Sequence, residues 1–329
     1  MKLDVGLNPY GLTYHLGLQG KGTPRANPNG KGLEGFIAIA TELKAKVLEI
    51  FDPWLAELSD QHLLDLKLRL ADLGMTPVIS AGLNMMGPIE SALRSARLLD
   101  AKVIRLGLSP VLEGSRNAWG IKWFELQHAI REGLSKYSPM AEAEGRILAI
   151  ENHQDFGSEE LADFCGEFGP AMGITLDTGN TFPVGEAPMD FVRRVAPLVR
   201  HVHFKDYRVQ FTDEGYRLVR CAIGDGAVPL KDMLAELGKY HDHMNAVLEP
   251  GALEARHIRF LNAAWWKGYR PMDAKAFAAA LAAARINRLP DDADTHTPWE
   301  RNADHELVDY ELAMIRRSAE NMRALGLMT

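Results

Sequence analysis

The chain has 329 residues, of which 47% are hydrophobic and 25% charged, and its formal net charge is −7. This balance is typical of a folded globular protein and excludes a disordered or fibrous chain. The negative charge argues against a nucleic-acid partner, because such a partner is bound largely through basic side chains. The two cysteines, Cys165 and Cys221, lie far apart and outside any CxxC spacing, which indicates neither a disulfide framework nor a cysteine zinc site.

The amino-terminal segment carries an aspartate at position 4 and a Gly-Leu-Asn-Pro break at 6–9. It therefore contains no apolar stretch of signal-peptide length. No window approaches the roughly eighteen apolar residues of a membrane-spanning helix. We expect a cytoplasmic protein without a membrane partner.

Short apolar or β-rich runs alternate with amphipathic helical patterns down most of the chain. Such alternation predicts a parallel sheet covered by helices, and eight units favour a closed (β/α)8 TIM barrel over an open doubly wound sheet. The predicted strands are 2–8, 46–52, 76–82, 102–108, 146–152, 172–178, 200–206 and 245–251. The predicted helices between them are 33–45, 59–74, 89–101, 124–145, 158–169, 189–199 and 230–242.

Three connections are longer than the others, and in a barrel all three begin at the carboxyl ends of strands. They span 10–35, 109–122 and 207–229. The first contains "GLQGKGTPRANPNGKG", which fails the phosphate-loop pattern because Gly32 follows Lys31 where Ser or Thr is required. We expect residues 16–35 to form a lid instead.

From about residue 252 the pattern changes to helices without strands, at 260–272, 273–290 and 304–328. We therefore expect a barrel domain over residues 1–251 and an appended helical extension over 252–329. Trp265 and Trp266 are expected to pack against the barrel, with an oligomer interface or a position over the active-site mouth as the alternatives.

Polar residues recur where the predicted strands end. Glu151 ends the fifth strand, Asp177 the sixth and Glu249 the eighth, while the seventh carries His201 and His203. A barrel brings all of these ends to one rim. Side chains two residues apart share one side of a strand, so Glu151 also shares its direction with the residue at 153.

Any one of these side chains could be a helix cap or the partner of an arginine. Three carboxylates converging on one barrel mouth would repel each other unless a cation or protons neutralised them. Two glutamates, one aspartate and one histidine suit Mn²⁺, Mg²⁺, Co²⁺ or Zn²⁺ and leave positions for a substrate. One divalent ion is therefore expected. The ligand set does not choose among these metals, and Mn²⁺ is taken as the preferred one.

At these residues the sequence resembles the xylose-isomerase-like barrel superfamily of sugar isomerases and epimerases, which also includes endonuclease IV. The resemblance covers roughly residues 1–250. It is carried by the glutamate of "AIEN", the aspartate of "LDTGN", the second histidine of "HVHFKD" and the glutamate of "LEPG". The segment "AIGDGAVP" at 222–229 resembles the family's glycine-rich segment before the seventh helix.

The resemblance implies that Glu151, Asp177, His203 and Glu249 hold one divalent ion. It also implies that Glu151 and Glu249 face each other across a bound sugar as proton-transfer groups. His203 is preferred to His201 because the family's ligand lies three positions before the aspartate of the "KD" pair. The implied chemistry polarises a carbonyl and its neighbouring hydroxyl and passes a proton through an enediolate.

The sequence also departs from this pattern. The ketohexose 3-epimerases carry a histidine three residues after the strand-six aspartate, whereas Asn180 stands here. Their substrate-contacting arginine lies six residues after the strand-seven histidine, whereas Arg208 lies five residues after it. The additional histidines of the endonuclease branch are missing. These departures argue against a simple free-ketohexose epimerase and against DNA repair.

Further strand-end residues are candidates for the same mouth. His15, Glu49, Asn180, His201 and Arg208 are predicted to bind substrate, and His153 and Lys205 to add charge or carry protons. A structural hydrogen-bonding role is the alternative for each. Asp206 is expected to point toward the outer layer.

Three functions remain open. The first is a metal-dependent isomerase or epimerase of a keto sugar or cyclitol, with homo-oligomer formation open. The second is a lyase on 3-keto-glycosides that uses the same enediolate and works with a small β-rich partner subunit. The third is a non-catalytic sugar-binding barrel, against which the two opposed glutamates count.

Overall fold

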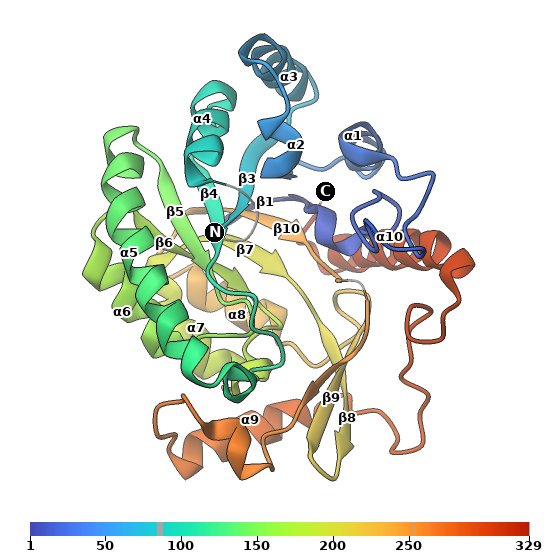
Figure 1. Cartoon of the computed structure of the whole chain (residues 1–329). Helices are drawn as coiled ribbons and strands as arrows, with labels where there is room; N and C mark the ends of the chain where they lie inside the picture. Colours follow the sequence, from blue (N-terminus) through green and yellow to red (C-terminus); the bar gives the residue numbers. More distant parts are fainter. Residues whose placement is uncertain (84–87, 252, 329) are drawn as a thin grey trace.

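Residues 1–83, 88–251 and 253–328 are described by the computed structural model of the chain. Eight parallel strands close into a barrel, in which β1 pairs with both β2 and β10 (Figure 1). The predicted (β/α)8 TIM barrel is therefore confirmed. In order around the barrel, the strands are β1 (Lys2–Leu7), β10 (His243–Leu248), β7 (Val199–Phe204), β6 (Met172–Asp177), β5 (Ile147–Glu151), β4 (Val103–Gly107), β3 (Thr76–Gly82) and β2 (Val47–Phe51).

The strands are apolar because helices cover their outer faces, and most of their residues are buried. Helix starts follow local chemistry: the Ser59 hydroxyl accepts the backbone N–H of His62 at 3.2 Å and begins α3. The helices are α1 (Gly32–Glu42), α2 (Asp52–Ala56), α3 (Asp60–Asp72), α4 (Ile89–Leu99), α5 (Ile121–Ala143), α6 (Ser158–Phe168), α7 (Pro188–Val195), α8 (Leu230–Leu237), α9 (Ala274–Ala284) and α10 (Leu307–Ala324). Short 3-10 turns are η1 (Pro9–Gly11), η2 (Arg116–Trp119), η3 (Phe182–Val184), η4 (Ala196–Leu198), η5 (Ala263–Trp266) and η6 (Asp304–Glu306).

A second, antiparallel sheet lies beyond one end of the barrel (Figure 1). Its strands β8 (Tyr207–Thr212) and β9 (Gly215–Arg220) form a hairpin inside the long connection after β7. The third strand, β11 (Arg256–Ile258), comes from the segment after β10 and pairs with β9. The expectation of helices without strands beyond residue 252 was therefore wrong, because β11 is too short to show a strand pattern.

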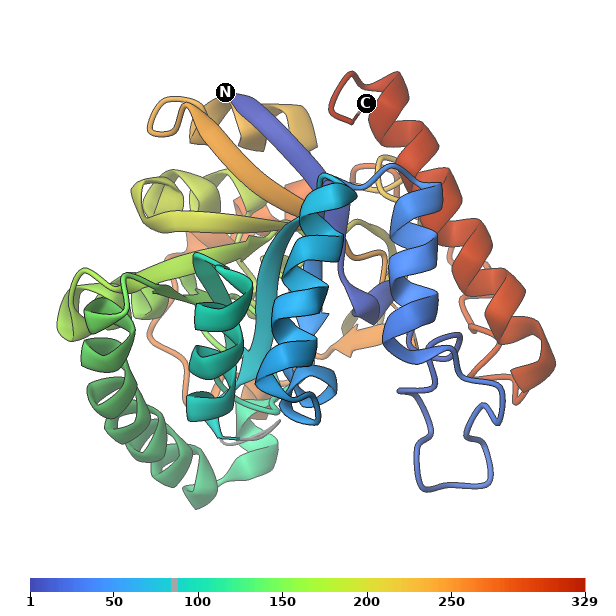
Figure 2. The same cartoon turned by 90° about the horizontal axis from the view of Figure 1, so that it is seen from above.

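The last helix, α10, lies beside α1 in both overall views (Figures 1 and 2). Arg316 pairs with Glu42 at the end of α1, and Arg317 pairs with Asp225 in the segment before α8. The expected appended extension thus includes a helix that covers the barrel between its first and seventh repeats. The division at residue 251 remains a prediction, and residue 252 itself lies outside the described residues.

The segment expected to form a lid is joined to the carboxy-terminal region. Arg25 pairs with Asp304, and its guanidinium lies 3.4 Å from the centre of the Trp299 ring. The Trp265 side chain is buried, and its indole N–H donates to the Glu113 carbonyl at 3.0 Å. Among the described helices, none is both long and apolar enough to cross a bilayer.

Candidate metal centre and active site

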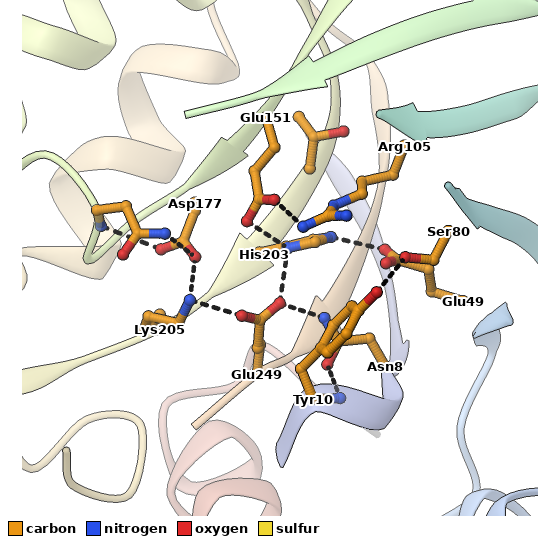
Figure 3. Close-up of polar contacts among 12 residues, drawn as sticks. Asn8, Tyr10, Glu49, Ser80, Arg105, Glu151, Asp177, His203, Lys205 and Glu249 are labelled. Carbon is orange, nitrogen blue, oxygen red and sulfur yellow. Dashed lines mark hydrogen bonds and ion pairs between the residues drawn. The ribbon is translucent and has the colours of Figure 1, made fainter. Parts of the chain in front are cut away.

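Four neighbouring strands bring together three carboxylates and an imidazole at the carboxyl end of the barrel (Figure 3). Glu151 ends β5, Asp177 ends β6, His203 lies in β7 opposite Asp177, and Glu249 directly follows β10. One potential ligand atom from each lies within 4.8 Å of the others, and all four side chains are buried. The cluster can therefore offer three oxygens and one nitrogen to a single ion.

The His203 ring is oriented by a carboxylate on its far side. Its Nε2 lies 2.6 Å from Glu49 Oε2, while its Nδ1 lies 2.8 Å from Glu249 Oε2 and 3.4 Å from Glu151 Oε1. A carboxylate behind a ligating imidazole is the usual way to fix such a ligand. His203 Nδ1 and Glu151 Oε1 are both enclosed, and neither makes a hydrogen bond of normal geometry with a described residue, although Nδ1 lies close to the Glu249 and Glu151 carboxylates. A cation would fit among these crowded ligand atoms.

The Asp177 carboxylate is held by the turn that follows β6. Its Oδ1 accepts the backbone N–H groups of Gly179 and Asn180 at 3.0 and 3.1 Å. Its Oδ2 accepts the Asn180 side-chain amide at 2.8 Å. Asn152 ties the ends of β5 and β6 together, because it accepts the Asp177 N–H at 2.7 Å and donates to the Asp177 carbonyl at 2.8 Å.

Two buried cations lie inside the same group of side chains. Lys205 Nζ lies 2.5 Å from both Asp177 Oδ2 and Glu249 Oε1. The Arg105 guanidinium, from the middle of β4, pairs with Glu151 and donates to the Ala81 carbonyl at 3.3 Å. Lysine and arginine therefore occupy opposite sides of the cluster, as Figure 3 shows.

Both glutamates of the cluster remain ionised. Burial opposes ionisation of Glu151, but the positive charge of Arg105 holds its pKa well below the ordinary value. Burial likewise opposes ionisation of Glu249, and Lys205 and His203 outweigh it and lower the pKa of that carboxyl. A general base must be ionised before it can accept a proton, so both carboxylates meet this requirement.

The aspartate and histidine respond differently to burial. Burial raises the pKa of Asp177 to about 6, although Lys205 opposes the change. Burial disfavours a proton on His203, but Glu49 and Glu249 outweigh it and raise its pKa well above the usual value. A proton on His203 and a metal ion are therefore alternatives at the same nitrogen.

The formal charges of the group leave room for a divalent ion. Glu49, Glu151, Asp177 and Glu249 supply four buried negative charges, whereas Arg105 and Lys205 supply two positive ones. With both histidines neutral, the deficit equals the charge of one divalent cation. An uncompensated deficit of this size would be costly in a buried site.

The structure brings most of the predicted site residues to this mouth. His153 lines the cavity with Nδ1 3.5 Å from Glu151 Oε2, and Lys205 and Asn180 contact Asp177. His201 lies deeper, with Nε2 3.0 Å from Glu49 Oε2. Glu49 and His201 are completely buried beneath His203, so neither reaches the cavity that a sugar would enter.

Two predicted substrate-binding residues lie elsewhere. The His15 backbone N–H donates to Glu311 of α10 at 2.8 Å, and the Lys31 and Arg316 charges act on its imidazole. Arg208 is exposed and lines a separate hollow with Cys221 and Asp225. Neither side chain lines the cavity above the cluster, so neither expected substrate contact is found there.

Sequence reasoning missed Arg105, Asn8 and Tyr10. The Asn8 amide donates to Glu249, and the Tyr10 hydroxyl lies 3.2 Å from Ser80 Oγ. The Arg105 guanidinium lies 5.4 Å from the centre of the Tyr10 ring. A signal for Arg105 was present, since a charged residue in the middle of the apolar run "VIRLG" must point into a polar barrel interior.

A cavity of about 210 Å³ opens above the cluster. It is lined by Tyr10, Thr13, Gly82, Arg105, Gly107, Ser109, His153, Gln154, Lys205, Arg220, Glu249, Gly251, Leu253 and Arg256. A larger hollow of about 610 Å³ lies between α6, α7 and the segment 269–276, and none of the cluster residues lines it. We take the smaller cavity as the active site because Glu249 and the cationic partners of the cluster, Lys205 and Arg105, line it.

Comparison with known families matches residues 37–263 to a profile described as xylose isomerase-like TIM barrel. A solved D-tagatose 3-epimerase-like protein superposes with a TM-score of 0.56 at 16% identity, over 95% of this chain and all of that one. The probable 3-DHS dehydratase AsbF from Bacillus anthracis gives 0.53 at 14% identity, over 75% of this chain and 92% of that one. At such identities the likeness concerns the fold.

Two curated proteins are similar in sequence. The 3-oxo-isoapionate decarboxylase of Pectobacterium atrosepticum is 24% identical over 250 residues, which are 72% of this chain and 86% of that protein. The uncharacterised protein YihM of Escherichia coli is 30% identical over 94 residues, 28% of this chain. The chain therefore aligns with only 29% of the length of YihM.

Proposed function

The chain belongs to the xylose isomerase-like TIM barrel family, and from that premise we propose that it is a divalent-metal-dependent isomerase or epimerase of a keto sugar or cyclitol. One observation carries the proposal: the ionised Glu151 and Glu249 belong to a buried cluster in which Asp177 and His203 also offer a ligand atom, all within 4.8 Å of one another. A site for binding alone does not require two such carboxylates around one cation.

Glu151, Asp177, His203 and Glu249 would hold the ion, with Mn²⁺ as the preferred metal. When bound, it would polarise a carbonyl and the adjacent hydroxyl of the substrate and stabilise the negative charge of an enediolate. The surrounding residues keep the four ligands in place. Glu49 fixes the His203 ring, and Asn180 and the turn after β6 fix Asp177.

The two glutamates would move the proton. One ionised carboxylate would remove the hydrogen next to the carbonyl and become a carboxylic acid, while the other would first take a proton from solvent and then return it to the opposite face or to the neighbouring carbon. Lys205 contacts Glu249 and Arg105 contacts Glu151, so each carboxylate has its own cationic partner. These partners stabilise the ionised form of each glutamate between turnovers.

Solvent deuterium exchange into a panel of keto sugars, catalysed by the Mn²⁺-loaded protein, tests this function. We expect exchange with the wild-type protein and a loss of about 100-fold or more in Glu151→Gln and Glu249→Gln. Glu132→Gln, which changes an exposed glutamate on α5, serves as the control and should exchange normally. A metal-loaded wild type that exchanged deuterium into no member of the panel would favour a sugar-binding barrel instead.

A second candidate is a lyase that uses the same enediolate to expel a group. Two observations favour it: His153 stands at the cavity wall beside Glu151, where it could protonate a leaving group, and the chain is similar to a decarboxylase of a 3-oxo acid. Release of an aglycone from a 3-keto-glycoside, or of CO₂ from a 3-oxo sugar acid, would select it. Purification of the native complex would show whether a small β-rich subunit accompanies the lyase or the chain forms a homo-oligomer.

A further inference from the structure

Four cationic side chains line the cavity above the cluster, and three of them have acidic partners. Arg105 pairs with Glu151, Lys205 with Asp177 and Glu249, and Arg256 with Glu254. The fourth, Arg220, is the exception. Its guanidinium makes no hydrogen bond or ion pair with any residue that the structure describes, and its Nε and Nη1 are enclosed.

The antiparallel sheet holds Arg220 at the cavity mouth. Arg220 is the last residue of β9, and β11 pairs with β9 through Arg256 opposite Leu218. The guanidinium lies on Gly251, where an added Cβ would come within 2.9 Å of Arg220 Nε. Gly251 has a φ of +77° and lies two residues after Glu249, so Arg220 stands directly beyond the end of β10.

No contact with a described residue explains this placement of Arg220 by a gain in stability. Enclosed guanidinium donors without acceptors cost free energy, because the water they lose is not replaced. Burial and the neighbouring charge of Arg256 lower the pKa of Arg220, which shows how unfavourable the surroundings are for its charge. Arg256 adds an enclosed Nε without a partner to the same wall.

We propose that Arg220, assisted by Arg256, binds a carboxylate of the substrate, and that the substrate class is therefore the acidic keto sugars. The inference rests on the proposed function, because that function places the reacting carbonyl of the substrate at the metal cluster beneath the cavity. A planar guanidinium can donate two parallel hydrogen bonds to the two oxygens of a carboxylate. The carboxylate then lies at the mouth, and the carbonyl end points to Glu151 and Glu249.

Calorimetric titration of the Mn²⁺-loaded protein with two matched ligands tests the proposal. The two ligands differ at the end remote from the carbonyl. L-Sorbose carries a hydroxymethyl group there, and 5-keto-D-gluconate carries a carboxylate. We expect the keto acid to bind wild type about tenfold or more tightly than the neutral sugar. Arg220→Gln should bind the two equally, and Arg220→Lys should keep only part of the preference.

Arg288→Gln is the matched control, because it removes an exposed arginine that lines a different hollow. It should keep the wild-type preference. Because Arg220 has no hydrogen-bond or ion-pair partner among the described residues, Arg220→Gln should melt at or above the wild-type temperature, which excludes misfolding as the cause of weaker binding. Addition of 5-keto-D-gluconate should raise the melting temperature of wild type more than L-sorbose does, whereas the two ligands should raise that of Arg220→Gln equally.

Equal affinities of wild type for the two ligands, including undetectable binding of both, would overturn the inference. A preference that survives in Arg220→Gln would overturn it as well. D-Fructose 6-phosphate provides a further comparison, in which the affinity of each anionic ligand is divided by that of its neutral sugar. A larger ratio for the phosphate than for 5-keto-D-gluconate would show a phosphate site and contradict the proposed binding of a carboxylate. The deuterium-exchange assay distinguishes failure of this inference from failure of the proposed function. A preference for the keto acid that depends on Arg220, without exchange of deuterium, would contradict the proposed isomerase but not the anion site.

Discussion

Asn180 shows how a residue next to the cluster controls it without entering the cavity. Its side-chain amide donates to Asp177 Oδ2 at 2.8 Å, and its own Oδ1 lies 3.4 Å from the Tyr207 hydroxyl. The substrate contact expected at this position from the sequence stays a prediction. In the structure Asn180 holds the carboxylate of Asp177, which we propose as a metal ligand.

Asn180→Ala should therefore weaken metal binding by about 10- to 100-fold, because Asp177 loses the side-chain donor that fixes its second oxygen. Titration of the metal-free variant with Mn²⁺, followed by calorimetry, measures the loss. Asn29→Ala, at an exposed loop position, is the control. Unchanged affinity in Asn180→Ala would mean that the backbone N–H groups of the turn hold Asp177 without help.

Arg105 tests how strongly the buried charges depend on one another. In metal-free protein, Arg105→Met should lower the free energy of unfolding by about 3–5 kcal/mol, since Glu151 loses its cationic partner inside the barrel. Denaturation by urea measures this change, and added Mn²⁺ should restore part of the loss. Arg131→Met removes the partner of the half-exposed Glu167 and should cost no more than about 1 kcal/mol. Equal losses in the two variants would contradict the expectation.

Most of the cluster could be predicted from the sequence because Glu151, Asp177, His203 and Glu249 share one position relative to their strands. That regularity is visible without coordinates. The direction of a side chain that follows a strand end cannot be seen in the sequence, as His15 and Arg208 show. Asn8 and Arg220 were not identified because their roles depend on contacts between segments far apart in the chain.

At the scale of elements, the docking of α10 onto the barrel depends on one buried carboxyl. Glu311 accepts the backbone N–H groups of Tyr14 and His15 at 2.9 and 2.8 Å, just after the first turn that follows β1. Burial raises the pKa of Glu311 to about 7 in the folded protein, against an ordinary value of 4.5. The folded state therefore binds this proton more tightly than the unfolded chain does.

This contact predicts a pH dependence with a definite sign. Protonated Glu311 contributes its full stabilisation below pH 4.5, and this contribution is lost as the pH rises to about 7. The free energy of unfolding falls by about 3 kcal/mol over this interval. Because an amide does not titrate, the unfolding free energy of wild type minus that of Glu311→Gln should fall across this interval. Urea denaturation at several pH values measures the difference. Glu42→Gln, at the half-exposed partner of Arg316, should show no such trend.

The elements themselves were predicted where local pattern decides them. All eight barrel strands overlap their predicted runs, because buried parallel strands are continuous apolar stretches. The hairpin of β8 and β9 was taken for part of a long loop. β11 has three residues and pairs with β9 across 38 to 42 positions of sequence, from Arg256 opposite Leu218 to Ile258 opposite Tyr216, so no local signal could reveal it.

For the whole molecule, the deficit of positive charge at the barrel mouth couples folding to metal binding. At a free Mn²⁺ concentration about 100 times its dissociation constant, the ion should stabilise the protein by about 2.7 kcal/mol. Thermal unfolding before and after chelation measures the effect as a fall in melting temperature. Asp177→Asn should show a much smaller dependence on Mn²⁺. A wild-type melting temperature that ignored both metal and chelator would argue against a metal at this cluster.

The wall that carries Arg220 and Arg256 is built from chain segments separate from the strands that carry Glu151, Asp177 and His203. Substitutions in the hairpin or in β11 can therefore alter which molecules are admitted while the proton chemistry stays intact. Descendants of one ancestral barrel could acquire new specificities through this small sheet alone. Transplanting residues 207–220 together with 256–258 into a related barrel would offer a practical route to redirecting its catalysis.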